Sequence, residues 1–402
     1  MITSKGNSLF SIANALVIFA FILSVSQLIW VYNGADRAFL YAPRWITIVR
    51  GIAVILLIVV LLLPKSRVFE THFTFNLEIW MIILASYIFI RGFYLEAGIP
   101  KITSFSSYVV LGLLIFNIKR RTTTAAAIQY PLRVLVYGSL LEALLLPHFA
   151  FSDSPSRFGV FFQFNRFCGL VSHPSLFAAI AFLYLVSVIS VKSKFWKIEF
   201  LIIVILLLYA NTASVLICLP LLYFMESRGK FQVNSLRLLG IAAPMVSIFV
   251  LFRTLSQEIT ISAIMGSDAL NARPVIWDWA FDTWLQSPEL GLSSESQNYS
   301  LKYSKTFYWA HAHNQILQDL LTGGFLRLLI VFIIYFKLLQ LALLRLREGH
   351  PQSIVVYILL ISQSTFEIPF TLNTIDFRFL TFLVLLLFNF VNFQRYTKLT
   401  GV

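Results

Sequence analysis

The chain has 402 residues, of which 58% are hydrophobic and only 12% are charged. A soluble domain carries about 25% charged residues, so this composition excludes a soluble globular protein and indicates a polytopic membrane protein. The formal net charge is +13, but Lys and Arg lie mostly in short connectors between apolar runs, which points to membrane topology and not to a nucleic-acid partner.

Apolar runs long enough to cross a bilayer, about 20 residues each, follow one another along the chain. The first run is too long for a signal peptide, so we expect an uncleaved first span. Around Asn211 the apolar stretch is too long for one helix and short for two, which predicts tilted or broken spans. The expected spans, about twelve in all, are 8–32, 46–63, 75–90, 104–118, 132–150, 174–191, 198–210, 212–226, 237–254, 315–343, 352–370 and 376–394.

The excess of Lys and Arg in alternate connectors predicts that both termini are cytoplasmic. Two unusual segments then face outward, namely 151–173 and the long polar loop 255–314. Their aromatic content argues against disorder. Within the second loop, 274–286 is expected to form a short amphipathic helix, because Pro274 fits a first helical turn. We therefore expect an all-α fold with a single transmembrane domain spanning 1–402.

His313 and Asn314 stand where the long loop enters the next span. A histidine just above the bilayer can accept a proton from a hydroxyl nucleophile near neutral pH. The alternative is an interfacial histidine that only caps or anchors the helix. His311 is the weaker candidate, because residues two apart on a helix face different sides.

Arginine side chains in both outer loops are candidates for binding phosphate. Arginine stays charged, and its planar guanidinium suits phosphate oxygens. Arg273 begins the expected loop helix, and Arg166 and Arg157 lie in the first outer loop. The alternatives are a lipid headgroup contact, an ion pair with Asp268 or Asp278 in the case of Arg273, and simple solvation.

Glu142 and Glu367 fall at membrane depth, where carboxylates are costly and are functional candidates by default. Glu367 is near an outer helix end and could orient an arginine or histidine of the site. The alternative is an internal ion pair with Arg50 or Arg327. The histidines and carboxylates lack metal-ligand spacing, so we expect catalysis without a metal. Cys168 and Cys218 also lack such spacing, and a disulfide between them stays open.

Three segments resemble the bacterial O-antigen ligase and O-antigen polymerase superfamily. HAHNQILQDLLTGGF resembles its His-Asn signature, with His313 and Asn314 followed by Gly324. LNARPVIWDWAFDTWLQSP is similar to its Gly-x-Arg segment ending in Ser-Pro, with Arg273 on the pattern. RFCGLVSHPSLFA is similar to the Arg-x-x-Gly...Pro turn of its polymerases, with Arg166 on the pattern.

The sequence departs from the family pattern at several positions. Asn271 replaces the usual glycine, and Arg327 stands where ligases usually carry Gly, Thr or Tyr. Many members, ligases especially, have an arginine in a turn between two middle helices, where this chain has Ala213. This departure leaves Arg166 or Arg157 as the second phosphate ligand.

The resemblance implies a metal-independent inverting glycosyltransferase without a cofactor, acting on the periplasmic face of the bacterial inner membrane. The donor would be a glycan on undecaprenyl pyrophosphate. His313 would activate the acceptor hydroxyl, while Arg273 and Arg166 would hold the pyrophosphate, with Asn314, Glu367 and Gly324 in support.

The acceptor distinguishes the two activities of the superfamily. A polymerase uses a second lipid-linked glycan, whereas a ligase uses lipid A-core. The departures at Ala213 and Arg327 favour the polymerase, which would have a chain-length regulator as a further partner. A lipid-linked sugar transporter or flippase is the more distant alternative, but the chain lacks the internal repeats typical of transporters.

Overall fold

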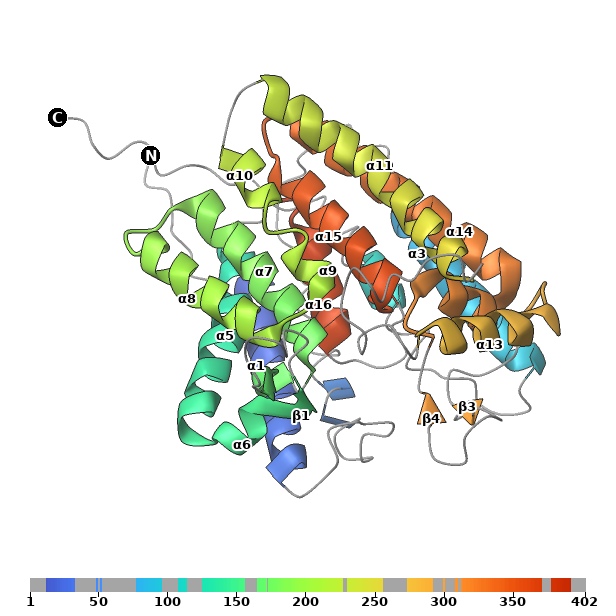
Figure 1. Ribbon diagram of the computed structural model, residues 1–402, viewed down its shortest axis with the longest axis horizontal. Coiled ribbons are helices and arrows are strands. Elements are labelled where there is room, and N and C mark those ends of the chain that lie inside the picture. Colours follow the sequence, from blue (N-terminus) through green and yellow to red (C-terminus); the bar gives the residue numbers. More distant parts are fainter. Residues whose placement is uncertain are drawn as a thin grey trace, which may run out of the picture.

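The computed structural model shows a mostly helical chain with a few short strands (Figure 1). The residues that it describes are 12–32, 48–49, 51–52, 77–95, 108–113, 125–155, 165–171, 173–226, 230–255, 273–291, 299–300, 308–309, 312–370 and 377–391. The expected spans 46–63 and 104–118 therefore lie largely outside the described residues.

The helices follow most of the predicted apolar runs. Their bounds are α1 Ile12–Tyr32, α3 Leu77–Leu95, α5 Ala126–Leu145, α6 Pro147–Ala150, α7 Pro174–Val191, α8 Trp196–Ala210, α9 Ala213–Leu216, α10 Leu221–Glu226, α11 Lys230–Leu255, α13 Arg273–Leu285, α14 Gln315–Arg347, α15 Gln352–Phe366 and α16 Phe377–Leu387.

By length and composition, three of the described helical segments can cross a membrane on their own, namely Pro174–Val191, Val233–Phe252 and Gln315–Arg347. Shorter apolar helices lie at Asn14–Ser26, Ala213–Met225, Gln352–Phe366 and Phe377–Leu387. The architecture is that of an all-α membrane protein, while the number of spans stays a prediction.

The first half of the bundle is built around α7. Nearly every residue of this helix is buried, because α5, α8 and α16 pack around it. Its bounds are those that the sequence predicts. Pro174 occupies the first turn, and Lys192 ends the helix with a left-handed backbone at φ 51.

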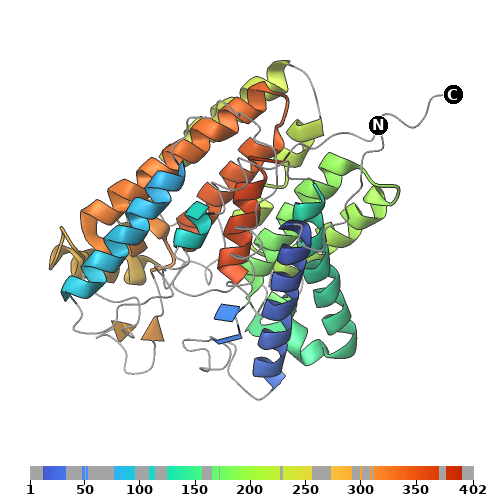
Figure 2. The ribbon, with the colours of Figure 1, turned by 180° about the vertical axis from the view of Figure 1, so that it is seen from behind.

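The second half is built around α15. Both α11 and α14 pack along α15, and α3 packs along α14 on the side seen in Figure 2. Only 17% of the apolar window of α11 is buried, so most of that helix faces outward. Apolar side chains without protein neighbours are expected where a helix meets lipid.

The predicted span 212–226 is broken. α9 is a single helical turn, residues 217–220 form a further turn, and α10 follows. Pro220, which lacks a backbone N–H and directly precedes α10, explains this break. Asn211, with a left-handed backbone at φ 46, ends α8 and separates it from α9. The disturbance that the sequence predicts around Asn211 therefore consists of two interruptions.

The two outer loops contain short strands that the sequence analysis does not predict. β1 (Phe151–Pro155) pairs with β2 (Asn165–Phe167) in antiparallel fashion, and a 3-10 turn, η1 (Gly169–Val171), leads toward α7. β3 (Tyr299–Ser300) pairs with β4 (Tyr308–Trp309). Figure 1 shows β1, β3, β4 and α13 at the same end of the bundle.

α13 is the helix expected at 274–286, and it packs against the first turns of α14. Its buried residues Ile276, Trp277 and Ala280 form a second apolar core with residues of α14 and with Leu251 of α11. The expected amphipathic character is wrong, because apolar side chains occur on every side of α13.

Candidate active site

α14 begins at a buried asparagine that fixes its first turn. The Oδ1 atom of Asn314 accepts a hydrogen bond from the backbone N–H of Leu317 at 3.2 Å, which makes Asn314 the N-cap of α14. Its Nδ2 atom donates to the carbonyl oxygen of Thr365 at 3.0 Å, near the end of α15. Asn314 therefore ties the start of α14 to the end of α15.

His313 precedes this cap with a left-handed backbone, at φ 50. A non-glycine residue in a sparsely populated backbone region costs about 1–3 kcal/mol and persists only where the surrounding structure holds it. The side chain of His313 is 26% exposed, so a substrate can reach it. The backbone thus presents this imidazole from a fixed position at the end of the bundle.

The imidazole of His313 faces a carboxylate. Its Nδ1 atom lies 3.5 Å from Oε2 of Glu367, the residue that follows α15. The other oxygen, Oε1, accepts a hydrogen bond from Oγ of Ser175 at 3.0 Å, in the first turn of α7. A carboxylate in this position orients an imidazole and stabilises the imidazolium that forms when histidine takes up a proton.

A second histidine, His173, lies beside this pair as the N-cap residue of α7. Its side chain is exposed at the surface, but many protein atoms lie around it and exclude part of the surrounding water. This desolvation lowers the pKa of His173 to about 4. The carboxylate of Glu367 opposes the decrease in pKa, whereas Arg378, Arg166 and His313 add to it. These four groups therefore lie near enough to His173 to act on its charge.

Arg166 extends from β2 to the turn between α8 and α9. Its Nε atom donates to the carbonyl oxygen of Ala210 at 3.1 Å, and its second guanidinium nitrogen donates to Oγ1 of Thr212 at 3.2 Å. The side chain is buried. The guanidinium thus lies at the turn that precedes Ala213, where the family pattern predicts an arginine.

Three predicted site residues cannot be placed in this arrangement. Arg273 is the first residue of α13, but its side chain is outside the part of the chain that the structure describes. Arg157 and His311 lie wholly outside the described residues. The proximity of Arg273 to His313 stays a prediction.

Gly324 interrupts α14 and allows another segment to approach its backbone. Its φ of 63 and ψ of −166 are not helical. A Cβ atom here would collide with the backbone of Glu289, which belongs to the turn that follows α13. The backbone N–H of Phe325 donates to the carbonyl oxygen of Pro288 at 3.0 Å. The glycine of the His-Asn signature and the Ser-Pro that ends the loop helix therefore meet at one contact.

The remaining candidates have separate surroundings. Glu142 is buried within α5, and Arg327, one of the partners considered for it, forms an ion pair with Asp319 at 2.9 Å. Cys168 and Cys218 are both buried and unbridged, so they form no disulfide. Among the described residues, no group of three His, Cys, Asp or Glu side chains has a metal-binding arrangement.

The comparison with family models identifies the segment that holds most of this site. Residues 158–332 match the family model described as O-antigen ligase. This match supports the resemblance to the O-antigen ligase and polymerase superfamily. The match includes Arg166, Arg273, His313 and Gly324, whereas Glu367 lies beyond it. A search of curated proteins found no match.

Ser175, His173 and Arg378 are not among the residues predicted from the sequence. The first two flank Pro174 at the start of a predicted span, on the side where the outer loops lie. Arg378 is the second residue of α16, near the start of the last expected span. A polar residue at the outer end of a predicted span is a signal that could have identified all three, because the ends of several spans converge there.

Proposed function

We propose that this protein transfers a glycan from undecaprenyl pyrophosphate to an acceptor hydroxyl on the periplasmic face of the inner membrane, as a metal-independent glycosyltransferase that polymerises lipid-linked repeat units. Members of the O-antigen ligase and polymerase family are glycosyltransferase-like enzymes. The observation that carries the proposal is the pairing of His313 with Glu367. Arg166 and Arg378 act electrostatically on the neighbouring His173, as does this pair.

In the proposed reaction, His313 removes the proton from the acceptor hydroxyl as its oxygen attacks the anomeric carbon of the donor. Glu367, at 3.5 Å, stabilises the imidazolium that forms. The bond from the anomeric carbon to the pyrophosphate oxygen breaks, and undecaprenyl pyrophosphate leaves with the electron pair. Attack from the opposite face inverts the anomeric configuration.

The leaving pyrophosphate gains negative charge, which fixed cationic groups can stabilise. We assign this role to Arg166 and Arg273. The hydrogen bonds from Arg166 to Ala210 and Thr212 support the first assignment, because they hold a guanidinium at the middle turn where Ala213 lacks one. An arginine supplied by β2 thus takes the place expected for an arginine on α9.

The lipid tail of the donor needs an apolar path beside the site. A cavity of about 240 Å³ opens between α11, α14 and α15, and most of its walls are apolar. Gln315 and Asp319, in the first turns of α14, also line it, so the cavity begins next to His313 along the chain. An apolar wall accepts part of an isoprenoid chain from the bilayer without exposing either surface to water. This cavity supports the placement of the tail between spans.

Ligation to lipid A-core is the second candidate function, favoured by the description of the matching family model as O-antigen ligase. The two functions share the donor and the site and differ in the acceptor. Polymerisation remains our proposal because Ala213 and Arg327 depart from the ligase pattern.

The test is the glycan pattern of cells whose own copy of this protein is replaced by the wild-type or the His313→Ala protein, with all other glycan-assembly enzymes intact. A ladder of repeats from the wild type, and a single repeat on lipid A-core from the variant, would support polymerisation. Long chains that never reach lipid A-core in the variant would establish ligation instead. His350→Ala, at the opposite end of α14, is the matched control, and membrane levels are compared by immunoblot. A normal ladder from well-expressed His313→Ala protein would exclude the proposed chemistry.

A further inference from the structure

α14 consists of two helical parts that a buried ion pair joins. Gly324 separates the first turns from the long second part. Asp319 lies before this break and Arg327 after it, and Nε of Arg327 donates to Oδ1 of Asp319 at 2.9 Å. Residues eight apart in an unbroken helix lie about 12 Å apart along the axis, too far for a direct ion pair. The break therefore brings the two side chains together.

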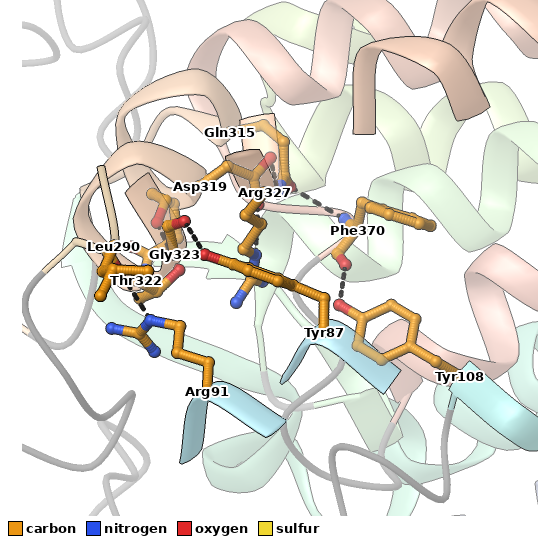
Figure 3. Close-up of polar contacts among 11 residues, drawn as sticks. Tyr87, Arg91, Tyr108, Leu290, Gln315, Asp319, Thr322, Gly323, Arg327 and Phe370 are labelled. Carbon is orange, nitrogen blue, oxygen red and sulfur yellow. Dashed lines mark hydrogen bonds and ion pairs between the residues drawn. The ribbon is translucent and has the colours of Figure 1, made fainter. Parts of the chain in front are cut away.

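Contacts with α3 and with the turn after α13 also stabilise the break in α14. Gly323 leaves room for the side chain of Arg327, since a Cβ atom there would collide with it. The hydroxyl of Tyr87 on α3 donates to the carbonyl oxygen of Gly323 at 2.6 Å. Arg91, one turn further along α3, donates through Nε to the carbonyl oxygen of Leu290 at 2.5 Å. Figure 3 shows these contacts around the ion pair.

Gln315 connects the ion pair to the segment after α15 (Figure 3). Its Nε2 atom donates to Oδ2 of Asp319 at 3.0 Å, and its Oε1 atom accepts from the backbone N–H of Phe370 at 3.0 Å. The carboxylate of Asp319 accepts only, so it fixes which end of the amide faces Phe370. The carbonyl oxygen of Phe370 is held in turn by the hydroxyl of Tyr108 at 2.8 Å.

The same two segments carry the His313–Glu367 pair. His313 is two residues before Gln315, and Glu367 is three residues before Phe370. The contact of Asn314 with Thr365 lies between the same segments. The side chains of three successive residues, 313–315, thus connect the start of α14 to the end of α15. The contact made by Gln315 is buried.

We propose that Gln315 and Asp319 are positioning residues that set the distance between Glu367 and His313, with Arg327 neutralising the buried charge of Asp319. The proposal rests on the proposed function, because it assigns a role in the same reaction. Loss of the Gln315 contact releases the turn that carries Glu367 and lowers turnover.

An exchange of functional groups tests this connection. Gln315→Glu places two acidic groups side by side, and Asp319→Asn places two amide donors side by side, so each variant breaks the link. The double variant Gln315→Glu/Asp319→Asn restores it, because the amide introduced at position 319 donates to the carboxylate introduced at position 315. That carboxylate still accepts from the backbone N–H of Phe370, and the Oδ1 atom at position 319 still faces Arg327. The net charge equals that of the wild type.

The measurement uses the purified full chain in lipid nanodiscs, with a synthetic polyprenyl-pyrophosphate oligosaccharide as donor and acceptor. A misplacement of about 1 Å can lower a rate by about 100-fold. We expect each single variant to lower kcat, measured at saturating donor, by about 10- to 100-fold, and the double variant to recover most of the loss. Gln315→Met, which removes both hydrogen bonds without adding a charge, keeps the test valid if a charged single variant does not fold, and it should lower kcat in the same way.

Arg345→Gln is the matched control, because it breaks the other ion pair of α14, with Glu348 at 2.6 Å, far from the site. Thermal unfolding of every variant reports folding. Wild-type kcat in Gln315→Met, or a folded double variant that stays as slow as the single variants, would overturn the positioning role. Full turnover in His313→Ala would instead overturn the proposed function, so the two failures are distinct.

Discussion

Replacing Glu367 by glutamine removes the negative charge opposite His313 and keeps the side-chain length and a hydrogen-bond partner for Ser175. At 3.5 Å, two unit charges attract by about 1 kcal/mol in bulk water and by about 5 kcal/mol at the effective dielectric constant of about 20 found near protein surfaces. The two side chains are 26% and 15% exposed, so the attraction lies between these limits. We expect the transition state to lose about 2–3 kcal/mol, which lowers kcat by about 30- to 160-fold.

The assay is turnover of a lipid-linked oligosaccharide by the purified chain, with kcat and the KM for the donor determined separately. The carboxylate acts on a charge that exists only after His313 has taken up the proton, so kcat should fall while KM stays near the wild-type value. Glu348→Gln, a carboxylate at the opposite end of α14, is the matched control and should leave kcat unchanged. An unchanged kcat in folded Glu367→Gln protein would refute the role of His313 as a base assisted by Glu367.

Three further predictions concern other parts of the site. Arg166→Lys keeps the charge but loses the paired contacts with Ala210 and Thr212. Hydrogen bonds to charged groups contribute about 1.5–3 kcal/mol, so kcat/KM should fall by about 10- to 160-fold. Wild-type kinetics would argue against Arg166 as a ligand of the pyrophosphate. The lowered pKa of His173 means that the unfolded chain binds more protons than the folded chain between pH 6.5 and about 4. Stability should therefore decrease across this range as the pH falls, and His173→Gln should weaken the decrease in detergent-based thermal unfolding; equal slopes would contradict this. Gly324→Ala forces a side chain into the turn at Glu289. Gly349→Ala is the matched control, because Gly349 also has a positive φ, of 85, but has open surroundings, so both variants share the backbone strain and only Gly324→Ala adds the collision. The membrane level of Gly324→Ala should therefore drop below that of Gly349→Ala.

The sequence predicts the membrane class and most helices well, because apolar runs and their flanking residues act locally. α7 illustrates this, with Pro174 at its start and Lys192 at its end. The break between α9 and α10 is harder to locate from the sequence. The residues before and after the break are mostly apolar, so hydrophobicity does not show where α9 ends. Pro220 is the local signal that marks this break, while Asn211 marks the end of α8.

The site is only partly visible in the sequence. His313, Asn314 and Glu367 can be singled out from their type and place, and the pairing of Glu367 with a histidine is one of the expectations for it. The link from Gln315 to Phe370 joins residues far apart in the chain, so no local pattern predicts it. The same holds for Arg166, which contacts a turn more than forty residues away. Such contacts depend on how the helices pack.

The convergence of α7 and α14 on Glu367 has an electrostatic consequence of its own. Ser175 lies in the first turn of α7, and His313 directly precedes the cap of α14, so two helix N-termini approach the same carboxylate. Each N-terminus carries the equivalent of about half a positive charge from its aligned peptide dipoles. The negative charge of Glu367, which lies between them, is therefore offset largely by fixed backbone charge. Because peptide dipoles do not titrate and need no side-chain rearrangement, this part of the attraction persists whatever the protonation state of the two histidines.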